Sequence, residues 1–441
     1  MMDRRQFAAG LAIAGSALVS NPSLGKVAPR RTFPTGFLWG AATAAYQVEG
    51  NNLNSDLWLV EAAPDTHYAE PAGDAANSFE LWPVDLDLVK AMGLNTYRFS
   101  LEWARIEPRI GEFSIAMLDH YKRMIEGCRS RGIKPFVTFN HFTTPAWFAL
   151  RGGWSQADAP DLFARYCLTA ARHLAEGIGF ATTLNEPNLA GQLASVLPQD
   201  IAKWLLPADK AVCEAIAKAH GVPLFLAGNN IWYPDPAAVQ AQLLRAHALG
   251  RAAIKSVRSD LPVGVSLAMV DDQAVGRNSL RDGVRERLYA PWLRAARQDD
   301  FVGVQNYERT LWDAKGRIDP PVGGDRNAAG AEVYPASLAG AAQYAHSVAN
   351  VPIIVTEHGV NTPDDKVRQR LIPAALAELH KLIAHGVPVQ GYIHWSLIDN
   401  FEWGFGYKPK FGLHELDRRT FRRTPKPSSN ILGTIARNNS L

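Results

Sequence analysis

Short apolar runs alternate with longer amphipathic stretches from Phe33 onward. Eight of these runs have the length and the β-branched or aromatic content of strands, namely Phe37–Ala42, Thr96–Ser100, Lys134–Asn140, Phe180–Asn185, Pro262–Val270, Phe301–Tyr307, Ile353–Glu357 and Gln390–Leu397. The intervening stretches have helical periodicity, most clearly at Asp119–Arg131 and Leu371–Ile383. Strands that alternate with helices form parallel sheets, so the pattern predicts an α/β protein with a single closed (β/α)8 barrel, the TIM barrel.

One long stretch between the fourth and fifth predicted strands, Leu189–Ile231, carries no readable chemical motif. Within it, Leu224–Ala227 is apolar enough to form an additional strand. The chain contains no tandem repeat and no low-complexity segment, and (β/α)8 barrels commonly use several hundred residues as one unit. We therefore expect residues 32–441 to form one catalytic domain.

The composition is that of an ordinary globular protein, because 47% of the 441 residues are apolar and 20% are charged. The formal net charge is only +3, and no basic stripe is interleaved with aromatic residues, so we expect no nucleic-acid partner. Cys128, Cys167 and Cys213 are odd in number, far apart and without metal-binding spacing. We expect buried, unpaired thiols, no metal site and no disulfide framework.

The first 31 residues differ in character from the rest of the chain. Arg4 and Arg5 stand in tandem before an apolar run, Ala8–Val19, that is too short to span a bilayer as an ordinary helix. This order is typical of a twin-arginine export signal. We therefore expect residues 1–31 to be a signal peptide and linker, and the mature protein to be exported to the periplasm without stable membrane insertion.

The active site of such a barrel lies at the carboxyl ends of the strands. The predicted strands therefore bring a set of polar and aromatic side chains to one mouth: Gln47, Arg98, His141, Asn185, Glu186, Tyr307, Glu357, Trp395, Glu402 and Trp403. Carboxylates, amides and indoles in one place suit a polyhydroxylated ligand and acid–base chemistry. By position alone, His141 would also suit a structural polar network, and the two tryptophans would suit a core.

Glu186 and Glu357 follow the fourth and seventh predicted strands. A glycosidic bond breaks through an oxocarbenium-like transition state, so its cleavage needs an acid for the leaving oxygen and an anion or nucleophile near the anomeric carbon. Glu357 follows an apolar strand, where its charge requires a partner such as the Arg98 guanidinium. This assigns Glu186 as the acid and Glu357 as the nucleophile, with no cofactor, although either glutamate alone would also suit a salt-bridged rim.

Four segments carry a resemblance to a known family, namely Phe33–Gly50, Tyr97–Ser100, Leu184–Pro187 and His394–Trp403. Their residues and their order resemble glycoside hydrolase family 1, the β-glucosidase family, over residues 33 to about 425. Several independent motifs spread over one domain make the resemblance specific. It implies a retaining β-glycosidase of β-glucosidase type that acts on a small β-glycoside through a covalent glycosyl-enzyme intermediate.

The resemblance also implies roles for individual positions. Asn185 and Glu186 match the acid/base segment, and Glu357 matches the nucleophile. Tyr307 matches a tyrosine that donates a hydrogen bond to the nucleophile, and Arg98 matches the arginine beside it. Further positions match residues that bind the sugar in the innermost subsite, where Asn185 also takes part; these are Gln47, His141, Trp395, Glu402 and Trp403.

Three positions depart from the family pattern. His358 stands where the family usually has Asn; a protonated imidazole there would favour the charged form of Glu357, and activity would fall as His358 loses its proton. Phe142 replaces an indole that lines the inner subsite, and Gln305 begins a Gln-Asn-Tyr segment where the family has Asn-Tyr-Tyr. These changes weaken the expectation of a simple glucose preference.

Glu402 favours a neutral sugar, because a carboxylate accepts hydrogen bonds from two hydroxyl groups and would repel a phosphate. Family members that take sugar 6-phosphates lack this carboxylate, while Lys408 and Lys410 leave some room for a phosphorylated substrate. A β-galactosidase, a β-xylosidase or a glycolipid or plant-glycoside hydrolase of the same family would carry the same motifs. A non-catalytic sugar-binding relative is disfavoured because both glutamates are present.

Overall fold

Eight parallel strands close into a barrel in the order β1-β11-β10-β7-β5-β4-β3-β2. They are β1 (Leu38–Ala42), β2 (Thr96–Ser100), β3 (Lys134–Asn140), β4 (Phe180–Asn185), β5 (Val263–Ala268), β7 (Val302–Asn306), β10 (Ile353–His358) and β11 (Val389–Trp395). The computed structural model describes residues 31–196 and 199–441. Every barrel strand lies within two residues of a run predicted from the sequence, so the (β/α)8 fold is confirmed.

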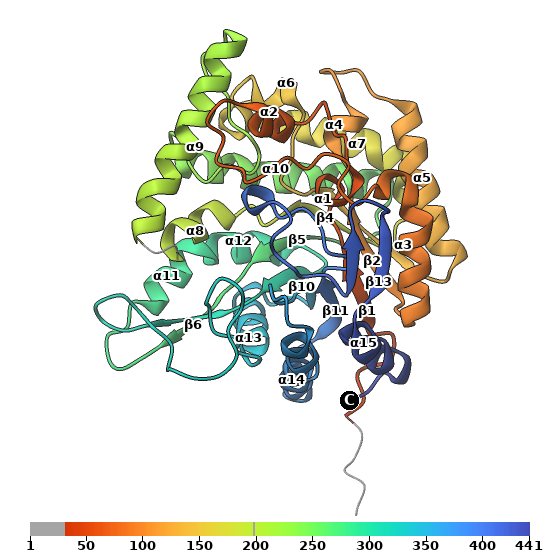
Figure 1. The fold of residues 1–441 in the computed structure, drawn as a ribbon, viewed down its shortest axis with the longest axis vertical. Helices are drawn as coiled ribbons and strands as arrows, with labels where there is room; N and C mark the ends of the chain where they lie inside the picture. Colours follow the sequence, from red (N-terminus) through yellow and green to blue (C-terminus); the bar gives the residue numbers. More distant parts are fainter. Residues whose placement is uncertain (1–30, 197–198) are drawn as a thin grey trace, which may run out of the picture. The chain divides into compact units, whose positions relative to one another are not determined.

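A ring of helices surrounds the barrel, with at least one helix after each strand (Figure 1). The ring consists of α3 (Ser78–Met92), α5 (Ile115–Ser130), α7 (Ala159–Leu174), α10 (Pro236–Val257), α12 (Ala290–Ala295), α13 (Ser337–Ala349), α14 (Asp365–Ala384) and α15 (Pro427–Asn438). The predicted helices Asp119–Arg131 and Leu371–Ile383 correspond to α5 and α14. Both bury an apolar face against the strands, as their periodicity required.

The core has two layers, because neighbouring residues of a strand point to opposite faces of the sheet. Phe136 and Ile354 belong to the cluster inside the barrel, whereas Val137 and Val355 belong to the cluster between the barrel and the helices. Large apolar side chains therefore fill the lower interior of the barrel. Polar side chains are left for the carboxyl ends of the strands.

The stretch Leu189–Ile231 contains α8 (Leu189–Val196) and α9 (Gln199–His220), and it precedes α10. The additional strand predicted at Leu224–Ala227 is wrong, because these residues belong to neither a helix nor a strand. Their apolar character comes from burial: Phe225 and Leu226 pack with Val212 and Ile216 of α9 in a separate cluster. An apolar run of this length indicates that the residues are buried, but it does not indicate whether they pair with another strand.

Shorter helices, turns and strands lie in the segments that connect the barrel strands to the surrounding helices. The helices are α1 (Ala45–Glu49), α2 (Asp56–Ala62), α4 (Trp103–Ile106), α6 (Ala146–Ala149) and α11 (Arg281–Leu288), and the 3₁₀ turns are η1 (Gly153–Ser155), η2 (Ala175–Gly177), η3 (Ala296–Gln298) and η4 (Trp403–Phe405). A small sheet contains β6 (Asp271–Ala274), β8 (Arg309–Trp312) and β9 (Arg317–Ile318), and a hairpin pairs β12 (His414–Asp417) with β13 (Arg422–Pro425).

The three cysteines are free and buried, which confirms the expectation of unpaired interior thiols. Burial raises the pKa of Cys128 to about 12, so this thiol is inert at neutral pH. The predicted export signal lies outside the described residues, apart from Arg31. Within the part of the chain that the structure describes, no helix has the length and apolar character needed to cross a membrane.

Candidate active site

Glu357 stands near the end of β10 with three donors on its carboxylate. Arg98 Nη1 donates to Oε1 at 2.6 Å, Gln305 Nε2 donates to the same oxygen at 2.9 Å, and the Tyr307 hydroxyl donates to Oε2 at 2.6 Å. Burial raises the pKa of Glu357, while the Arg98 charge and the Tyr307 hydrogen bond act in the opposite direction. The buried carboxylate therefore has the partners that its charged form requires.

Asn185, the last residue of β4, is held by two donors on its amide oxygen. Arg98 Nη2 reaches Oδ1 at 2.5 Å and Gln305 Nε2 reaches it at 2.8 Å. The amide nitrogen Nδ2 lies 3.2 Å from His141 Nε2. Burial and the Arg98 charge place the pKa of His141 well below its usual value, so the imidazole is neutral and accepts at Nε2.

Glu186 follows Asn185 in a different environment. Its φ angle is 45°, in the left-handed region, and Pro187 behind it disfavours the right-handed helical conformation. Among the described residues, its carboxyl group has no hydrogen-bond or ion-pair partner. Burial and the nearby Glu357 carboxylate raise the pKa of Glu186 well above its usual value, which favours the protonated acid.

Glu402 lies after β11 beside an indole and an amide. Trp395 Nε1 donates to Glu402 Oε1 at 3.2 Å, and a Gln47 side-chain hydrogen bond also lowers the pKa of this carboxyl group. Burial outweighs both and raises the pKa of Glu402 to about 8. The His141 ring plane is inclined by 17° to the rings of Trp395 and of Trp403. The Glu402 carboxyl group and these aromatic rings therefore lie at the same mouth of the barrel.

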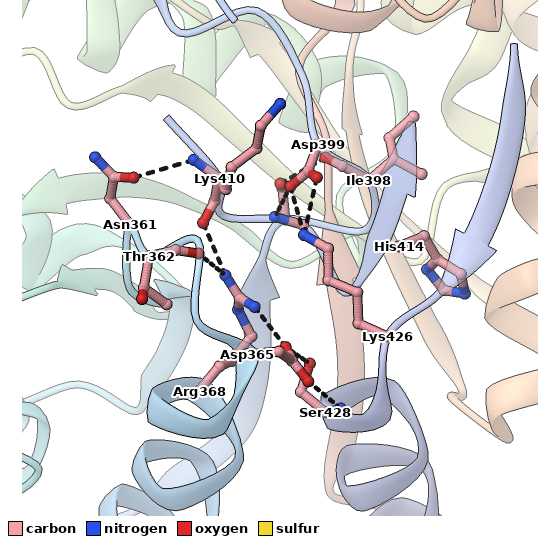
Figure 2. Close-up of polar contacts among 12 residues, drawn as sticks. Asn361, Thr362, Asp365, Arg368, Ile398, Asp399, Lys410, His414, Lys426 and Ser428 are labelled. Carbon is pink, nitrogen blue, oxygen red and sulfur yellow. Dashed lines mark hydrogen bonds and ion pairs between the residues drawn. The ribbon is translucent and has the colours of Figure 1, made fainter. Parts of the chain in front are cut away.

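A polar network, shown in Figure 2, holds the loop that follows β11 and carries Glu402. Lys426 Nζ lies 2.8 Å from both carboxylate oxygens of Asp399, and Arg368 Nη2 donates to the Lys410 carbonyl oxygen at 2.7 Å. Arg368 and Asp399 are buried. Side chains from the start of α14 and from the N-cap of α15 therefore fix the position of the loop that follows β11.

The structure brings all ten predicted site residues to one mouth. Hydrogen bonds join Arg98 to Glu357 and Asn185, and ring contacts join His141 to the two tryptophans. Glu186 belongs to the same site because it directly follows Asn185 and interacts electrostatically with Glu357. Within residues 31–196 and 199–441, no cluster of three or more His, Cys, Asp or Glu side chains could hold a metal ion.

The predicted effect of His358 on Glu357 is wrong. His358 Nδ1 lies 2.9 Å from the Tyr392 hydroxyl, and Tyr392 belongs to the core layer between the barrel and the helices. Alternation along β10 thus turns His358 away from Glu357. Burial lowers the pKa of His358 to about 3, so the ring is neutral and supplies no positive charge.

Gln305 is the site residue whose role the sequence did not reveal. It lies in β7 and pairs with Glu357 in the neighbouring strand. Its position at a strand end and its departure from the family pattern were the available signals. The sequence could not show that one amide group reaches both Asn185 and Glu357.

A pocket with an empty volume of ≈ 840 Å³, its open mouth included, lies on the Glu186 side of the site. Its walls come from the end of β4, from α8, from the segment around Tyr233 and from α10. Phe142, Leu189 and Tyr233 contribute apolar surface, and Asn188 and Asn230 contribute amides. A mostly apolar wall with a few polar groups is typical of pockets for organic ligands.

The fold and the site define a (β/α)8 enzyme of the paired-carboxylate type. A family model described as "Glycosyl hydrolase family 1" matches residues 29–270 and 324–441, well over half of the chain. The chain belongs to glycosyl hydrolase family 1, and it is a glycoside hydrolase. The residues outside the match are 1–28 and 271–323, and the second stretch includes Gln305 and Tyr307.

Similar proteins extend over nearly the whole chain. A solved structure titled "Crystal structure of beta-glycosidase BGL167" is 43% identical and has a TM-score of 0.85, with 93% of this chain and 98% of that chain covered. Beta-glucosidase A from Thermotoga maritima is 29% identical, with 93% of this chain and 99% of the relative covered. A relative from Oryza sativa subsp. japonica, 28% identical with 90% of each chain covered, is named "Probable inactive beta-glucosidase 14".

Proposed function

We propose that this chain is a β-glucosidase-like retaining glycosidase for neutral sugars, with Glu357 as nucleophile and Glu186 as acid/base. The observation that carries the proposal is the contrast between the surroundings of the two carboxyl groups. Glu357 accepts hydrogen bonds from Arg98, Gln305 and Tyr307, whereas the pKa of the unpartnered Glu186 is raised well above its usual value. One group is thus prepared to carry charge and the other to carry a proton.

In the first step, a Glu357 oxygen attacks the anomeric carbon while Glu186 gives its proton to the leaving oxygen. The bond to the leaving group breaks and an ester bond to Glu357 forms. As the Glu357 charge is lost, its contribution to the raised Glu186 pKa is lost, while burial and the Glu402 charge continue to raise that pKa. Glu186, now ionised, is therefore stabilised as a base for the second step.

In the second step, Glu186 removes a proton from water, and the resulting oxygen attacks the anomeric carbon. The ester bond breaks and returns the electron pair to Glu357, whose charge is again supported by Arg98 and Tyr307. Two inversions at one carbon give net retention. We assign the pocket lined by Glu186 to the aglycone, because Glu186 protonates the leaving oxygen and the apolar part of the wall suits an aryl or other organic group.

The chemistry is tested by covalent trapping and by product stereochemistry. A 2-fluoro glycoside with a good leaving group should raise the mass of the intact protein by one sugar, on a peptide that contains Glu357. Proton NMR should show the β-anomer of the sugar as the first product. A first product of inverted configuration, or a label on another residue, would contradict the assignment, and Glu357→Gln is the matched unlabelled control.

The preferred sugar is tested with a panel of aryl β-glycosides that differ only in the sugar. Glu402 and the nearby Gln47 and Trp395 favour a neutral sugar that presents adjacent hydroxyl groups. The proposal expects the glucoside to have the highest kcat/KM. A galactoside or xyloside in first place would support a β-galactosidase or β-xylosidase of the same family, and a 6-phosphate in first place would contradict the role of Glu402.

We also propose that the chain is exported to the periplasm by the twin-arginine route, on the strength of Arg4, Arg5 and the short apolar run Ala8–Val19. The full chain should appear in the periplasmic fraction of a twin-arginine-competent bacterium. A variant with Arg4→Lys and Arg5→Lys should remain in the cytoplasm. Equal export of both forms would contradict this route.

A further inference from the structure

We propose that Gln305 is a positioning residue that aims the Asn185 amide at the sugar hydroxyl next to the anomeric carbon. This inference rests on the proposed function and adds a determinant of substrate recognition to it. Gln305 itself touches Asn185 and Glu357, at 2.8 Å and 2.9 Å, and acts through them.

Gln305 and Arg98 form two parallel bridges between the same pair of side chains. Each donates to Glu357 Oε1 and to Asn185 Oδ1. Gln305 does so from one nitrogen, Nε2, which has two hydrogen atoms and uses one on each acceptor. The nucleophile and the amide are therefore tied together by an amide on one side and a guanidinium on the other.

Two donors on Oδ1 fix the orientation of the Asn185 amide. A flipped amide would place its NH₂ group against the donors of Arg98 and Gln305, so Oδ1 must face them. The nitrogen Nδ2 then faces away from them, toward His141 Nε2 at 3.2 Å. Since one of its two hydrogens is enough for His141, the other is free to donate to a ligand.

The hydroxyl group that Asn185 can reach is set by its tether to Glu357. Glu357 attacks the anomeric carbon, and Asn185 is held to it through two bridging groups. The hydroxyl group nearest to the anomeric carbon is the 2-hydroxyl, which is bonded to the adjacent ring carbon. Hydrogen bonds to this hydroxyl strengthen in the transition state of glycoside cleavage, so the orientation of Asn185 affects rate as well as binding.

The length of the side chain matters for the bridge. The family pattern has Asn at this position, and Asn is one methylene, about 1.5 Å, shorter than Gln. A shorter amide on the same strand loses that reach toward two acceptors. Gln305 Oε1 is buried and has no partner among the described residues, which is an unfavourable placement for a carbonyl group. The side chain is therefore held in place by its Nε2 contacts.

The test compares an aryl β-glycoside with its 2-deoxy counterpart in wild type, Gln305→Met and Gln305→Asn. Met keeps the length of the side chain and removes both donors. Each variant should lose roughly tenfold in the ratio of kcat/KM for the 2-hydroxy substrate to kcat/KM for the 2-deoxy substrate. In an Asn185→Ala background, Gln305→Met should leave this ratio unchanged, because the amide that it positions is absent.

The matched control is Asn306→Ala, which removes a buried amide from the next residue. Asn306 hydrogen-bonds to the Met269 carbonyl and to Ser337, away from Asn185, so its loss should lower the melting temperature and leave the substrate ratio unchanged. A folded Gln305→Met enzyme with an unchanged ratio would overturn the inference. In that case wild-type turnover and trapping at Glu357 would still stand, whereas failure of the proposed function would abolish both.

Discussion

Two glutamates of the same barrel mouth lie in opposite surroundings. Glu357 stands in β10, beside a register shift in the pairing with β7, and accepts hydrogen bonds from three side chains. Glu186 stands just outside β4 in a left-handed backbone conformation, and none of the described side chains binds its carboxyl group. The residue type is the same, so the difference in chemical role comes from the neighbours.

The contrast also concerns freedom of movement. A nucleophile must hold one oxygen on the line of attack, and three donors restrict the Glu357 carboxylate to one arrangement. An acid/base group must first lose a proton to the leaving oxygen and then take one from water. A carboxyl group without fixed partners, beside an open pocket, suits both tasks.

The largest effect is expected for Glu357→Gln. The amide cannot form the ester intermediate, so kcat should fall by about 10⁴-fold or more on every substrate. Steady-state kinetics with activated and unactivated aryl glycosides provide the measurement. Comparable activity of the variant on any β-glycoside would show that Glu357 is not the nucleophile.

Glu186→Gln should separate substrates by their leaving groups. Loss of the acid should lower kcat/KM by about 10²- to 10⁴-fold for leaving groups of high pKa. Glycosides whose leaving group needs no proton should keep their rate of glycosyl transfer to the enzyme, measured as a burst of released phenol. An equal loss for both kinds of substrate would overturn the assignment of the acid.

Tyr307→Phe should weaken the support of the Glu357 charge. The removed hydroxyl donates to Oε2 at 2.6 Å and lowers the pKa of Glu357, so the variant should have a higher Glu357 pKa. The acidic limb of the kcat/KM profile should then move to higher pH, because the ionised nucleophile is lost sooner as pH falls. We expect a loss of about 10- to 100-fold at the optimum, and an unmoved acidic limb would contradict this role.

His358→Asn should have the smallest effect on catalysis. The pKa of His358 is lowered to about 3 and its side chain contacts Tyr392, so its removal changes no charge beside Glu357. The pH profile should keep its shape, while thermal denaturation should show a loss of about 1 kcal/mol from the missing hydrogen bond. A shift of the acidic limb would restore an electrostatic role for His358.

Local pattern and strand position were sufficient to predict most of the fold and the location of the site. The eight strands, the mouth and the site positions followed from apolar runs and from the rule that barrels place function at strand ends. The predicted strand at Leu224–Ala227 is wrong, because a short apolar run is the same in sequence whether it is buried against a helix or paired in a sheet. The predicted influence of His358 on Glu357 is wrong as well, because adjacent residues of a strand face opposite sides of the sheet and His358 contacts Tyr392.

The sequence by itself determined the barrel, the family and the two glutamates at the ends of strands four and seven. Only the tertiary structure decided which partners each glutamate has, because Arg98, Gln305 and Tyr307 come from strands far from Glu357 along the chain. Periodicity sets the face on which a side chain lies. The protonation of a buried carboxyl group depends on distances of a few ångströms to charges and donors, which exist only after the barrel has closed.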